Sequence, residues 1–452
     1  MTASPASGGN PVFEALHERL TRRTATAGVI GLGYVGLPLA AAIGCAGFPV
    51  VGFDIDPTKP EQIEAGKSYI QAVTDDMLVQ LVRDKRLTAT SDFSRLSACD
   101  VIIICVPTPL TRHREPDLSF VRSTGEAIAR FLRPGQLIVL GSTTYPGTTR
   151  EVLLPILAAG GSVSGRDFFL GFSPEREDPG NAKFGTVSIP KVVAGDGPQA
   201  LALMQTFFEV VVQTIVPVST LEVAEAVKIT ENVFRAVNIA LANELKTVFT
   251  AMGIDVWEVI DAAKSKPFGF MPFYPGPGLG GHCIPIDPFY LTWKSREYDV
   301  TTRFIELAGE INVSMPKLVV DALARALDRR LGVTLGSAKI LLLGLAYKKN
   351  VADVRESPSL KLLELMNAQG AAVAFHDPLV EAVPMTRNHV ALAGRRSVTL
   401  SAETIAGFDA VLISTDHDDV DYGLVLANAR LIVDTRNVMA RKGLVGDNIV
   451  KA

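Results

Sequence analysis

Short apolar runs recur through the first part of the chain and are separated by longer stretches with helical periodicity. The clearest runs are residues 27–30, 50–54, 101–106 and 137–140. Apolar runs of this length that alternate with helices are typical of βαβ units, whose parallel strands are covered on both faces. The pattern therefore predicts a doubly wound α/β domain.

The same plan begins again near Ala338. The predicted strands of this second series are residues 339–343, 371–375, 410–414 and 431–434. In each series an aspartate stands directly before the third strand, Asp100 in the first and Asp409 in the second. We therefore expect a second doubly wound domain of related architecture.

The sequence between the two series, from about residue 219 to residue 328, has a different pattern, dominated by helical periodicity. Apolar positions from Leu221 to Val248 follow a roughly helical period until Gly253 ends it. Ser219 and Glu222 have the spacing of a capping box at its start. Such a helix would be about 50 Å long, which is enough to connect two domains and leave surface for a partner subunit.

Together these patterns predict an α/β protein in which two doubly wound, Rossmann-like domains are joined by a central helical domain with a long helix. A chain of 452 residues, 48% of them hydrophobic, has enough apolar side chains for separate cores. The predicted divisions are an N-terminal tail (residues 1–24), the first Rossmann domain (25–218), the central helical domain (219–330) and the second Rossmann-like domain (331–452).

Charge and hydropathy exclude several classes of partner. The formal net charge is −4 and charges of both signs are mixed along the chain, so no nucleic acid or anionic membrane surface is expected to bind. Residues 1–10 lack the basic and apolar regions of a signal peptide, and the apolar runs are too short to span a bilayer. We expect a cytoplasmic protein with no membrane partner.

The four cysteines predict neither a metal site nor a disulfide scaffold. Cys45, Cys99, Cys105 and Cys283 share no metal-ligand spacing and are too few for a disulfide framework in a chain of this length. Cys45, Cys99 and Cys105 lie among apolar or small residues, as core cysteines do. Reduced thiols and no bound metal are therefore expected.

A glycine-rich motif follows the first predicted strand. In "GLGYVGLP", Gly31 and Gly33 allow the backbone to turn and approach a pyrophosphate, while Gly36 allows close packing of helix on strand. Asp54 follows the next strand in the position of an acceptor for the adenosine ribose, which favours NAD over NADP. The alternative is a degenerate Rossmann domain that no longer binds a dinucleotide. The residues predicted to bind the cofactor are Gly31, Gly33, Tyr34, Val35, Gly36, Asp54, Lys59, Pro107, Thr108 and Ser142.

The least ordinary stretch is "PGPGLGGHCIPIDP", residues 275–288. A core thiol usually lies in an apolar helix or strand, whereas Cys283 stands in a Gly-rich turn with Asp287 nearby. These surroundings favour a nucleophilic Cys283 over a buried thiol, and His282 is expected to be structural.

Polar residues on the long helix form a second cluster. Lys228 and Asn232 are four residues apart and so share a face, with Glu225 one turn earlier. Such a face is either solvated or, near a domain junction, a donor set for an alkoxide. Glu175 lies in the charged segment "FSPEREDPGN", for which an exposed loop is the alternative.

The first strand of the second series is followed by "GLAYKKNVADVRES", residues 344–357, and not by a G-x-G motif. Its basic residues Lys348, Lys349 and Arg355 suit phosphate groups, although an ordinary solvated loop would explain them equally well.

In motif order the chain resembles the UDP-glucose/UDP-N-acetylhexosamine 6-dehydrogenase family from about Ala27 to the C-terminus. The Gly-rich loop, "GSTTYPGTT", "SPER", the Lys-x-x-x-Asn helix, "GGHCIPIDP", "GLAYKKNVADVRES" and "DTRN" occur in the family's order. The sequences of "SPEREDPGN" and of residues 266–291 are most similar to those of the UDP-N-acetylglucosamine branch.

The resemblance implies a role for each matching residue. Cys283 would be the nucleophile, Lys228 and Asn232 would hold the C6 oxygen, and Asp287 would assist Lys228. Glu175 would act in thioester hydrolysis and Thr143 would position water. Arg355 matches a position near the cofactor. The predicted substrate-binding residues are Arg176, Lys228, Asn232, Tyr274, Gly278, Gly280, Lys348 and Arg436.

The implied reaction is a four-electron oxidation of the C6 alcohol of a UDP-sugar by two NAD, through a Cys283 thiohemiacetal and thioester. UDP-N-acetylglucosamine is the expected substrate, with UDP-N-acetylmannosamine, UDP-N-acetylgalactosamine and UDP-glucose as alternatives, in the synthesis of surface polysaccharide precursors. More remote alternatives are a single-step β-hydroxyacid-type dehydrogenase, which needs neither Cys283 nor a third domain, and a non-catalytic NAD-binding protein.

The resemblance also implies a homodimer through the central helical domain. One departure from the family is informative. An Arg that UDP-glucose enzymes supply from a partner subunit has no counterpart in "KPFGFMPFYPGPG". Completion of the site by a partner subunit is therefore an open question.

Overall fold

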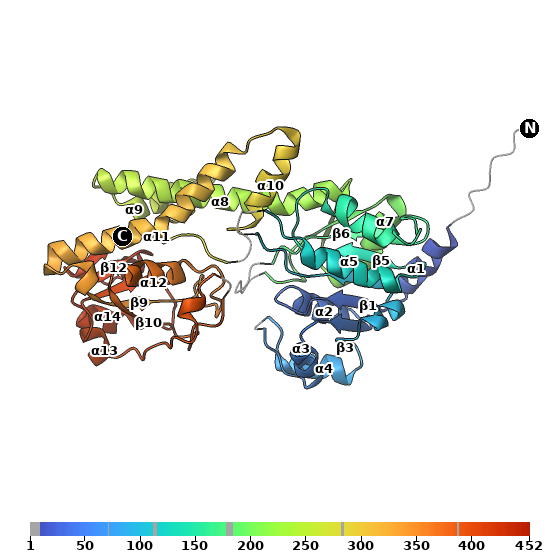
Figure 1. Cartoon of the computed structure of the whole chain (residues 1–452), viewed down its shortest axis with the longest axis horizontal. Coiled ribbons are helices and arrows are strands. Elements are labelled where there is room, and N and C mark those ends of the chain that lie inside the picture. Colours follow the sequence, from blue (N-terminus) through green and yellow to red (C-terminus); the bar gives the residue numbers. More distant parts are fainter. Residues whose placement is uncertain (1–9, 71, 112–114, 178–183, 282–283, 387) are drawn as a thin grey trace, which may run out of the picture. The chain divides into compact units, whose positions relative to one another are not determined.

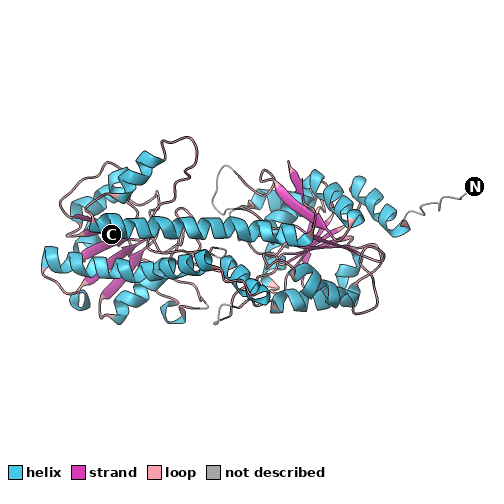
Figure 2. Ribbon diagram, turned by 90° about the horizontal axis from the view of Figure 1, so that it is seen from above, coloured by secondary structure: helices cyan, strands magenta, loops and turns pink. Residues whose placement is uncertain are grey.

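The computed structural model describes residues 10–70, 72–111, 115–177, 184–281, 284–386 and 388–452. It divides into two compact units. Unit 1 comprises Met1–Glu231 and Trp293–Tyr298, and unit 2 comprises Asn232–Thr292 and Asp299–Ala452. Each unit is built on its own sheet, with helices flanking the strands (Figure 2).

The sheet of unit 1 has eight strands in the order β3-β2-β1-β4-β5-β6-β7-β8. Every neighbouring pair is parallel except β6 and β7. Ile30 pairs with both Phe53 and Ile104, so the carboxyl ends of β1, β2 and β4 are level and the loops that follow them meet. The strands are β1 (Ala27–Ile30), β2 (Val50–Phe53), β3 (Leu87–Thr90), β4 (Val101–Ile104), β5 (Leu137–Leu140), β6 (Phe169–Phe172), β7 (Lys191–Gly195) and β8 (Ile215–Pro217).

The helices of unit 1 connect these strands as the alternating pattern predicts (Figure 1). They are α1 (Pro11–Thr21), α2 (Gly36–Cys45), α3 (Thr58–Glu64), α4 (Asp75–Arg83), α5 (Ser119–Phe131), α6 (Leu154–Ala158) and α7 (Pro198–Val211), with a 3-10 turn at Phe93–Ala98 and a π turn at Thr149–Leu153. α1 lies in the segment expected as a tail. Its Leu16 and Leu20 are fully buried in the core because they are four residues apart on one helical face.

The sheet of unit 2 has five parallel strands in the order β10-β9-β11-β12-β13. Its apolar core lies on both faces of this sheet. The strands are β9 (Lys339–Leu343), β10 (Ala372–His376), β11 (Ala410–Ile413), β12 (Ile432–Asp434) and β13 (Ile449–Lys451), and the helices are α12 (Pro358–Ala368), α13 (Ala402–Ala406), α14 (Tyr422–Asn428) and α15 (Val438–Arg441), with 3-10 turns at Leu335–Ser337 and Val390–Leu392.

The two sheets share a hydrogen bond between an aspartate and the start of the first strand, in agreement with the predicted related architecture. The aspartate before the third predicted strand has the same role in both. Asp100 Oδ2 accepts a hydrogen bond from the Thr26 N–H at 2.9 Å, and Asp409 Oδ2 accepts one from the Lys339 N–H at 2.9 Å. Each carboxylate thereby holds the start of the first strand of its sheet.

The central helical segment contains α8 (Leu221–Ala251), α9 (Val256–Ala263), α10 (Asp287–Ser295) and α11 (Arg303–Leu331), with a 3-10 turn at Arg296–Tyr298. The 31 residues of α8 give a length of about 46 Å, and Gly253 follows with φ +72° as expected. The predicted capping box was wrong by one residue. Thr220, and not Ser219, accepts the Val223 N–H at 3.2 Å, because adjacent hydroxyls offer the same capping chemistry.

Candidate functional site

The three motif glycines in the loop after β1 are required for different reasons. A Cβ at Gly31, which has φ +90°, would lie 2.4 Å from the Cys105 carbonyl oxygen, and one at Gly36 would lie 1.8 Å from that of Gly31. A Cβ at Gly33 would meet no atom of the described chain within 4 Å. Gly31 and Gly36 are thus fixed by the fold, whereas Gly33 borders open space where a ligand can approach the backbone.

The start of α2 suits an anion. No side chain caps this helix end, and its first turn carries no acidic residue. Backbone N–H groups at an uncapped helix start attract phosphate. The open space at Gly33 and this helix end fit the pyrophosphate of the predicted cofactor, with Tyr34 and Val35 in the turn between them.

Asp54 lies directly after β2 and is 5% exposed. Its Oδ2 accepts hydrogen bonds from the Leu32 N–H at 2.9 Å and from Lys59 Nζ at 2.8 Å, and its Oδ1 accepts the Asp56 N–H at 3.0 Å. A carboxylate has about four acceptor positions, so one remains for a ribose hydroxyl. The structure therefore brings the predicted residues Asp54 and Lys59 together.

Hydroxyl groups join the loops that follow β4 and β5. Thr108 Oγ1 donates to the Thr143 carbonyl at 2.7 Å, and Ser142 Oγ donates to the Val106 carbonyl, beside Pro107, at 2.7 Å. These contacts hold the two loops at the edge of the sheet where ligands of doubly wound folds bind. Roles for these side chains toward NAD or water stay predictions.

Glu225 ties α8 to the loop that carries Thr143. Its Oε2 accepts the Gly147 N–H at 2.5 Å, and its Oε1 accepts the Thr149 N–H at 2.8 Å and the Thr149 hydroxyl at 2.6 Å. Burial raises the pKa of Glu225 to about 7 despite these hydrogen bonds. The sequence placed Glu225 on the polar face of the helix but did not show this role.

Glu175 follows β6 and is held as a carboxylate. Its Oε1 accepts the N–H groups of Arg176 and Glu177 at 2.8 and 2.9 Å, and Lys191 Nζ lies 3.3 Å from Oε2. Burial alone would raise the pKa of Glu175, but the Lys191 ammonium and the backbone N–H groups outweigh burial and lower it. Lys191, which is 5% exposed in β7, was not predicted. The sequence signal that could have indicated it is a lysine at the start of an otherwise apolar strand.

The Arg176 side chain is held by an ion pair, unlike a side chain in an exposed loop. Its Nε donates to Glu231 of α8 at 2.9 Å, and its Nη1 donates to the Pro190 carbonyl at 2.7 Å. The "SPER" segment is thereby fixed to α8. Substrate contact by Arg176 stays a prediction.

Lys228 and Asn232 are 5% and 0% exposed, so the polar face of α8 that they share is buried at this point. Asn232 Nδ2 donates to Asp287 Oδ2, at the start of α10, at 2.6 Å. Asn232 Oδ1 is buried and has no hydrogen-bond partner within the described part of the chain. A buried unpaired carbonyl oxygen costs about 1–3 kcal/mol, so this oxygen is available to accept a hydrogen bond.

Cys283 and His282 lie outside the described residues, so their predicted roles are not tested. The glycines before them pack on the loop after β9. A Cβ at Gly280 would lie 2.6 Å from Tyr347 Cβ, and Gly281 donates its N–H to the Arg355 carbonyl at 3.1 Å. A Cβ at Gly278 would contact Pro358 at 3.3 Å. These glycines therefore serve close packing of two loops.

Two other cysteines are poor nucleophiles. Burial raises the pKa of Cys99 and of Cys105 to about 12, so both stay protonated near neutral pH. The expectation of a core thiol was wrong for Cys45, which is exposed because it ends α2.

Arg436 follows β12 and lies against the same glycine-rich segment. Its Nε donates to the Ser414 carbonyl at 2.7 Å, and a Cβ at Gly276 would lie 2.5 Å from its Nη1. Lys348 is half-buried in the loop after β9. Arg355, in the same loop, forms an ion pair with Asp353 at 2.6 Å.

Tyr274 belongs to an aromatic cluster. Its hydroxyl donates to Asp261 at 2.5 Å, its ring stacks on Trp257 at 5.6 Å, and the Arg441 guanidinium lies 4.5 Å from the ring centre. These contacts fix the segment before the glycines. Substrate contact by Tyr274 stays a prediction.

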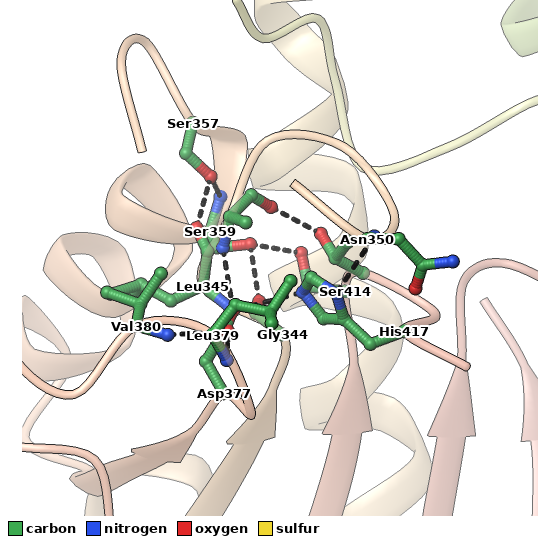
Figure 3. Close-up of polar contacts among 12 residues, drawn as sticks. Gly344, Leu345, Asn350, Ser357, Ser359, Asp377, Leu379, Val380, Ser414 and His417 are labelled. Carbon is green, nitrogen blue, oxygen red and sulfur yellow. Dashed lines mark hydrogen bonds and ion pairs between the residues drawn. The ribbon is translucent and has the colours of Figure 1, made fainter. Parts of the chain in front are cut away.

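The loops at the carboxyl ends of β9, β10 and β11 share a buried network (Figure 3). Asp377 Oδ2 accepts the N–H groups of Leu345 and Ala346 at 2.7 and 2.9 Å and lies 3.1 Å from His417 Nε2. The Asn350 N–H donates to His417 Nδ1 at 3.0 Å, so Nε2 carries the proton shared with Asp377. Neither His417 nor this network was predicted.

The opposite oxygen of Asp377 is occupied as well. Oδ1 accepts the N–H groups of Leu379 and Val380 at 2.8 and 3.0 Å. Burial would raise the pKa of Asp377, but the hydrogen bond from His417 and those from the backbone lower it. The Asp377 carboxylate therefore holds together the loops that surround it.

Among the described residues, no cluster of three or more His, Cys, Asp or Glu side chains could hold a metal ion. No helix among the same residues is long and apolar enough to cross a membrane.

Comparisons with known proteins cover nearly the whole chain. Residues 25–212, 222–314 and 341–441 match the NAD-binding, central and UDP-binding domains of the UDP-glucose/GDP-mannose dehydrogenase family. The chain is 37% identical to UDP-N-acetyl-D-glucosamine 6-dehydrogenase of Pseudomonas aeruginosa over 78% of this chain and 83% of that one. It is 32% identical to UDP-N-acetyl-D-mannosamine dehydrogenase of Methanococcus maripaludis over 91% and 92% of the two chains.

A solved structure agrees. The fold matches UDP-D-ManNAc dehydrogenase of Pyrococcus horikoshii with a TM-score of 0.85 at 31% identity, covering 94% of this chain and 98% of that one. The predicted family, fold class and cofactor are thereby confirmed. The chain belongs to the UDP-glucose/GDP-mannose dehydrogenase family and is an NAD-dependent UDP-sugar dehydrogenase.

Proposed function

We propose that the enzyme oxidises the C6 alcohol of UDP-N-acetylglucosamine to the carboxylate in two successive oxidations, with Cys283 as the nucleophile. The observation that carries the proposal is the buried Asn232 amide. Its Nδ2 donates to Asp287 Oδ2 at 2.6 Å, and its Oδ1 has no hydrogen-bond partner among the described atoms. This oxygen would accept a hydrogen bond from the C6 hydroxyl, and Lys228, one turn earlier on α8, would stabilise the alkoxide that forms.

Each of the two oxidations removes a hydride from C6 and a proton from its oxygen, and the proton leaves to water. NAD, when bound, would supply the hydride acceptor. After the first oxidation, the Cys283 thiolate attacks the C6 aldehyde and forms a thiohemiacetal. Loss of the second hydride leaves a thioester, and water then releases the acid and restores the thiol.

Glu175 would remove a proton from the water that attacks the thioester. The Lys191 ammonium and two N–H groups lower the pKa of Glu175, so the carboxylate is ready to accept this proton. Thr143 would orient the same water.

UDP would bind to the C-terminal domain, through Lys348 and Arg436, and NAD to the N-terminal domain. The domain divisions of the proposal are those predicted from the sequence. Because NAD and nucleotide sugars are cytoplasmic metabolites, the enzyme would act there, supplying precursors of surface polysaccharides.

A homodimer through α8 is part of the proposal. Phe234, Leu241 and Val248 are 46–51% exposed and follow one another at intervals of seven residues. Apolar side chains at this spacing form a continuous stripe on a helix, as in helices that pair with a second copy. Size measurement in solution tests this part.

Substrate identity rests on relatives named for two sugars, glucosamine and mannosamine derivatives. The test is NADH production from a panel of UDP-sugars, followed to completion. We expect the highest kcat/KM with UDP-N-acetylglucosamine and two NADH for each sugar consumed. One NADH for each sugar would instead support a single-step dehydrogenase, and a higher kcat/KM for the mannosamine substrate would replace the proposed sugar.

A further inference from the structure

The buried His417 ring joins two parts of the loop that follows β9, residues 344–350 (Figure 3). Its Nε2 donates to Asp377 Oδ2 at 3.1 Å, and the same oxygen accepts two N–H groups at the start of the loop. Its Nδ1 accepts the Asn350 N–H at 3.0 Å. His417 therefore connects the start of this loop to its end, and Lys348 lies between the two connected parts.

Several contacts hold Asn350 in an uncommon backbone conformation. Its φ of +59° lies in the left-handed region, which residues with a side chain seldom adopt. Its Nδ2 donates to Asp418 Oδ2 at 2.7 Å, and its Oδ1 accepts the Asp418 N–H at 3.0 Å. Lys349 Nζ lies 2.6 Å from Asp418 Oδ1. The backbone directly after Lys348 is thereby fixed to the loop that follows β11.

The position of Lys348 depends on these contacts because its backbone lies between the parts of the loop that are held. A side chain on a fixed backbone has less conformational freedom to lose when a ligand binds, so its contact with the ligand is stronger. A mobile loop would first have to become ordered. The two hydrogen bonds of His417 thus prepare the loop before a ligand arrives.

We propose that His417 is a positioning residue, whose Nδ1 holds the loop so that Lys348 meets the nucleotide part of a UDP-sugar. The inference rests on the proposed binding of UDP through Lys348, and it adds a residue that acts through another side chain. NAD affinity should not depend on His417, because NAD binds in the N-terminal domain.

Two substitutions separate the roles of the two ring nitrogens. His417→Asn places an amide oxygen near the position of Nδ1 and removes the donor to Asp377. His417→Gln places an amide nitrogen near the position of Nε2 and removes the acceptor for Asn350. UDP binding to the full-length protein is measured by calorimetry. We expect His417→Gln to bind UDP about tenfold more weakly than the parent, a difference of about 1.4 kcal/mol, and His417→Asn to stay within about threefold of the parent.

A matched control makes the same substitution at another histidine of this sheet. The His376 ring contacts the Val398 carbonyl at 2.8 Å, so His376→Gln should bind UDP like the parent. NAD affinity, measured in the same way, should be unchanged in all three variants.

A double variant shows whether the effect passes through Lys348. In a Lys348→Met background, His417→Gln should weaken UDP binding by no more than about twofold, because the contact that His417 positions is already gone. Additive losses in the double variant would overturn the proposal. It would also fail if His417→Gln bound UDP like the parent, or if His417→Asn lost as much affinity as His417→Gln.

Oxidation of UDP-sugars by the parent tests the proposed function separately. If the UDP affinities follow the expected order but no UDP-sugar is oxidised, the positioning role stands and the proposed function fails. If UDP-sugars are oxidised while the affinities of the variants are equal, the positioning role of His417 fails and the proposed function stands. Failure of the parent to bind UDP would overturn both.

A thermal melt of each variant checks folding. Each of the two His417 substitutions removes one hydrogen bond of the same ring, so these two variants should melt at similar temperatures. If either does not fold, amide hydrogen exchange of the parent provides a second test. The Asn350 N–H should exchange slowly before UDP is added, because it donates to His417. A freely exchanging Asn350 amide would refute the positioning role.

Discussion

Replacing Glu225 with Gln tests the connection between α8 and the loop that carries Thr143. The carboxylate accepts three hydrogen bonds, from Gly147 and Thr149. A Gln amide can keep the two from Thr149 through its oxygen, but its NH₂ then faces the Gly147 N–H. Leaving the buried Gly147 N–H without a partner costs about 1–3 kcal/mol.

The size of this effect depends on pH. Glu225 has a pKa of about 7 in the folded protein, above the usual value of about 4.3 in an unfolded chain. The folded state therefore binds more protons between these values, and the stability from Glu225 is full below pH 4.3 and is lost as pH rises through 7. The two pKa values differ by about 2.7, so the free energy of unfolding of the wild type falls by roughly 2–3 kcal/mol between pH 5 and 8. Glu225→Gln has no carboxyl group at this position and does not show this fall.

Calorimetric melting of both proteins at pH 5, 6.5 and 8 measures the difference. We expect the advantage of the wild type in melting temperature to shrink by about 5–10 °C over this range, at about 2–4 °C for each kcal/mol. Glu209→Gln, at an exposed position of α7, should give a constant difference. An advantage for the wild type that stays constant or grows with pH would show that the pKa of Glu225 is not raised, and would refute the reasoning.

Three further predictions concern the reaction. Cys283→Ala should yield no uronate. Cys283→Ser should accumulate an ester, seen by mass spectrometry as added mass on the peptide containing residue 283, because a serine hydroxyl is far less ionised than a thiol. Two NADH per sugar from the Ala variant would contradict the covalent mechanism. NAD should be preferred over NADP by at least about tenfold in kcat/KM, since a repulsion of about 1.4 kcal/mol between Asp54 and a 2′-phosphate suffices, and equal values would disprove that role of Asp54. Lys191→Met should raise the pKa of Glu175 and move the acidic limb of the plot of kcat against pH to higher pH, because the Lys191 ammonium favours the carboxylate. Lys191→Arg should restore the pH dependence of kcat. An acidic limb that does not move in Lys191→Met would exclude Glu175 as the base.

Local patterns predicted the fold well. The strands were recognisable because buried parallel strands are continuous apolar runs, and β1, β5 and β9 have the expected bounds. Gly31 and Gly36 were predicted as backbone requirements, and both positions exclude a Cβ. These features depend on residues close together in sequence, so sequence spacing carries the information.

Contacts between distant segments were not predicted. Lys191 meets Glu175 because β6 and β7 pair in antiparallel fashion, a departure from the parallel pattern that no local signal announced. His417 was overlooked because its partners Asn350 and Asp377 lie on two other loops.

The occupied carboxylate of Asp377 has a consequence for competition between nucleotides. Asp377 stands after β10 as Asp54 stands after β2, but its oxygens already accept four N–H groups and face His417. Asp54 keeps an acceptor position for a ribose hydroxyl, whereas Asp377 has none to offer. The C-terminal domain therefore lacks the feature that would let adenosine ribose dock there, and excess NAD should not inhibit the enzyme by occupying the UDP site.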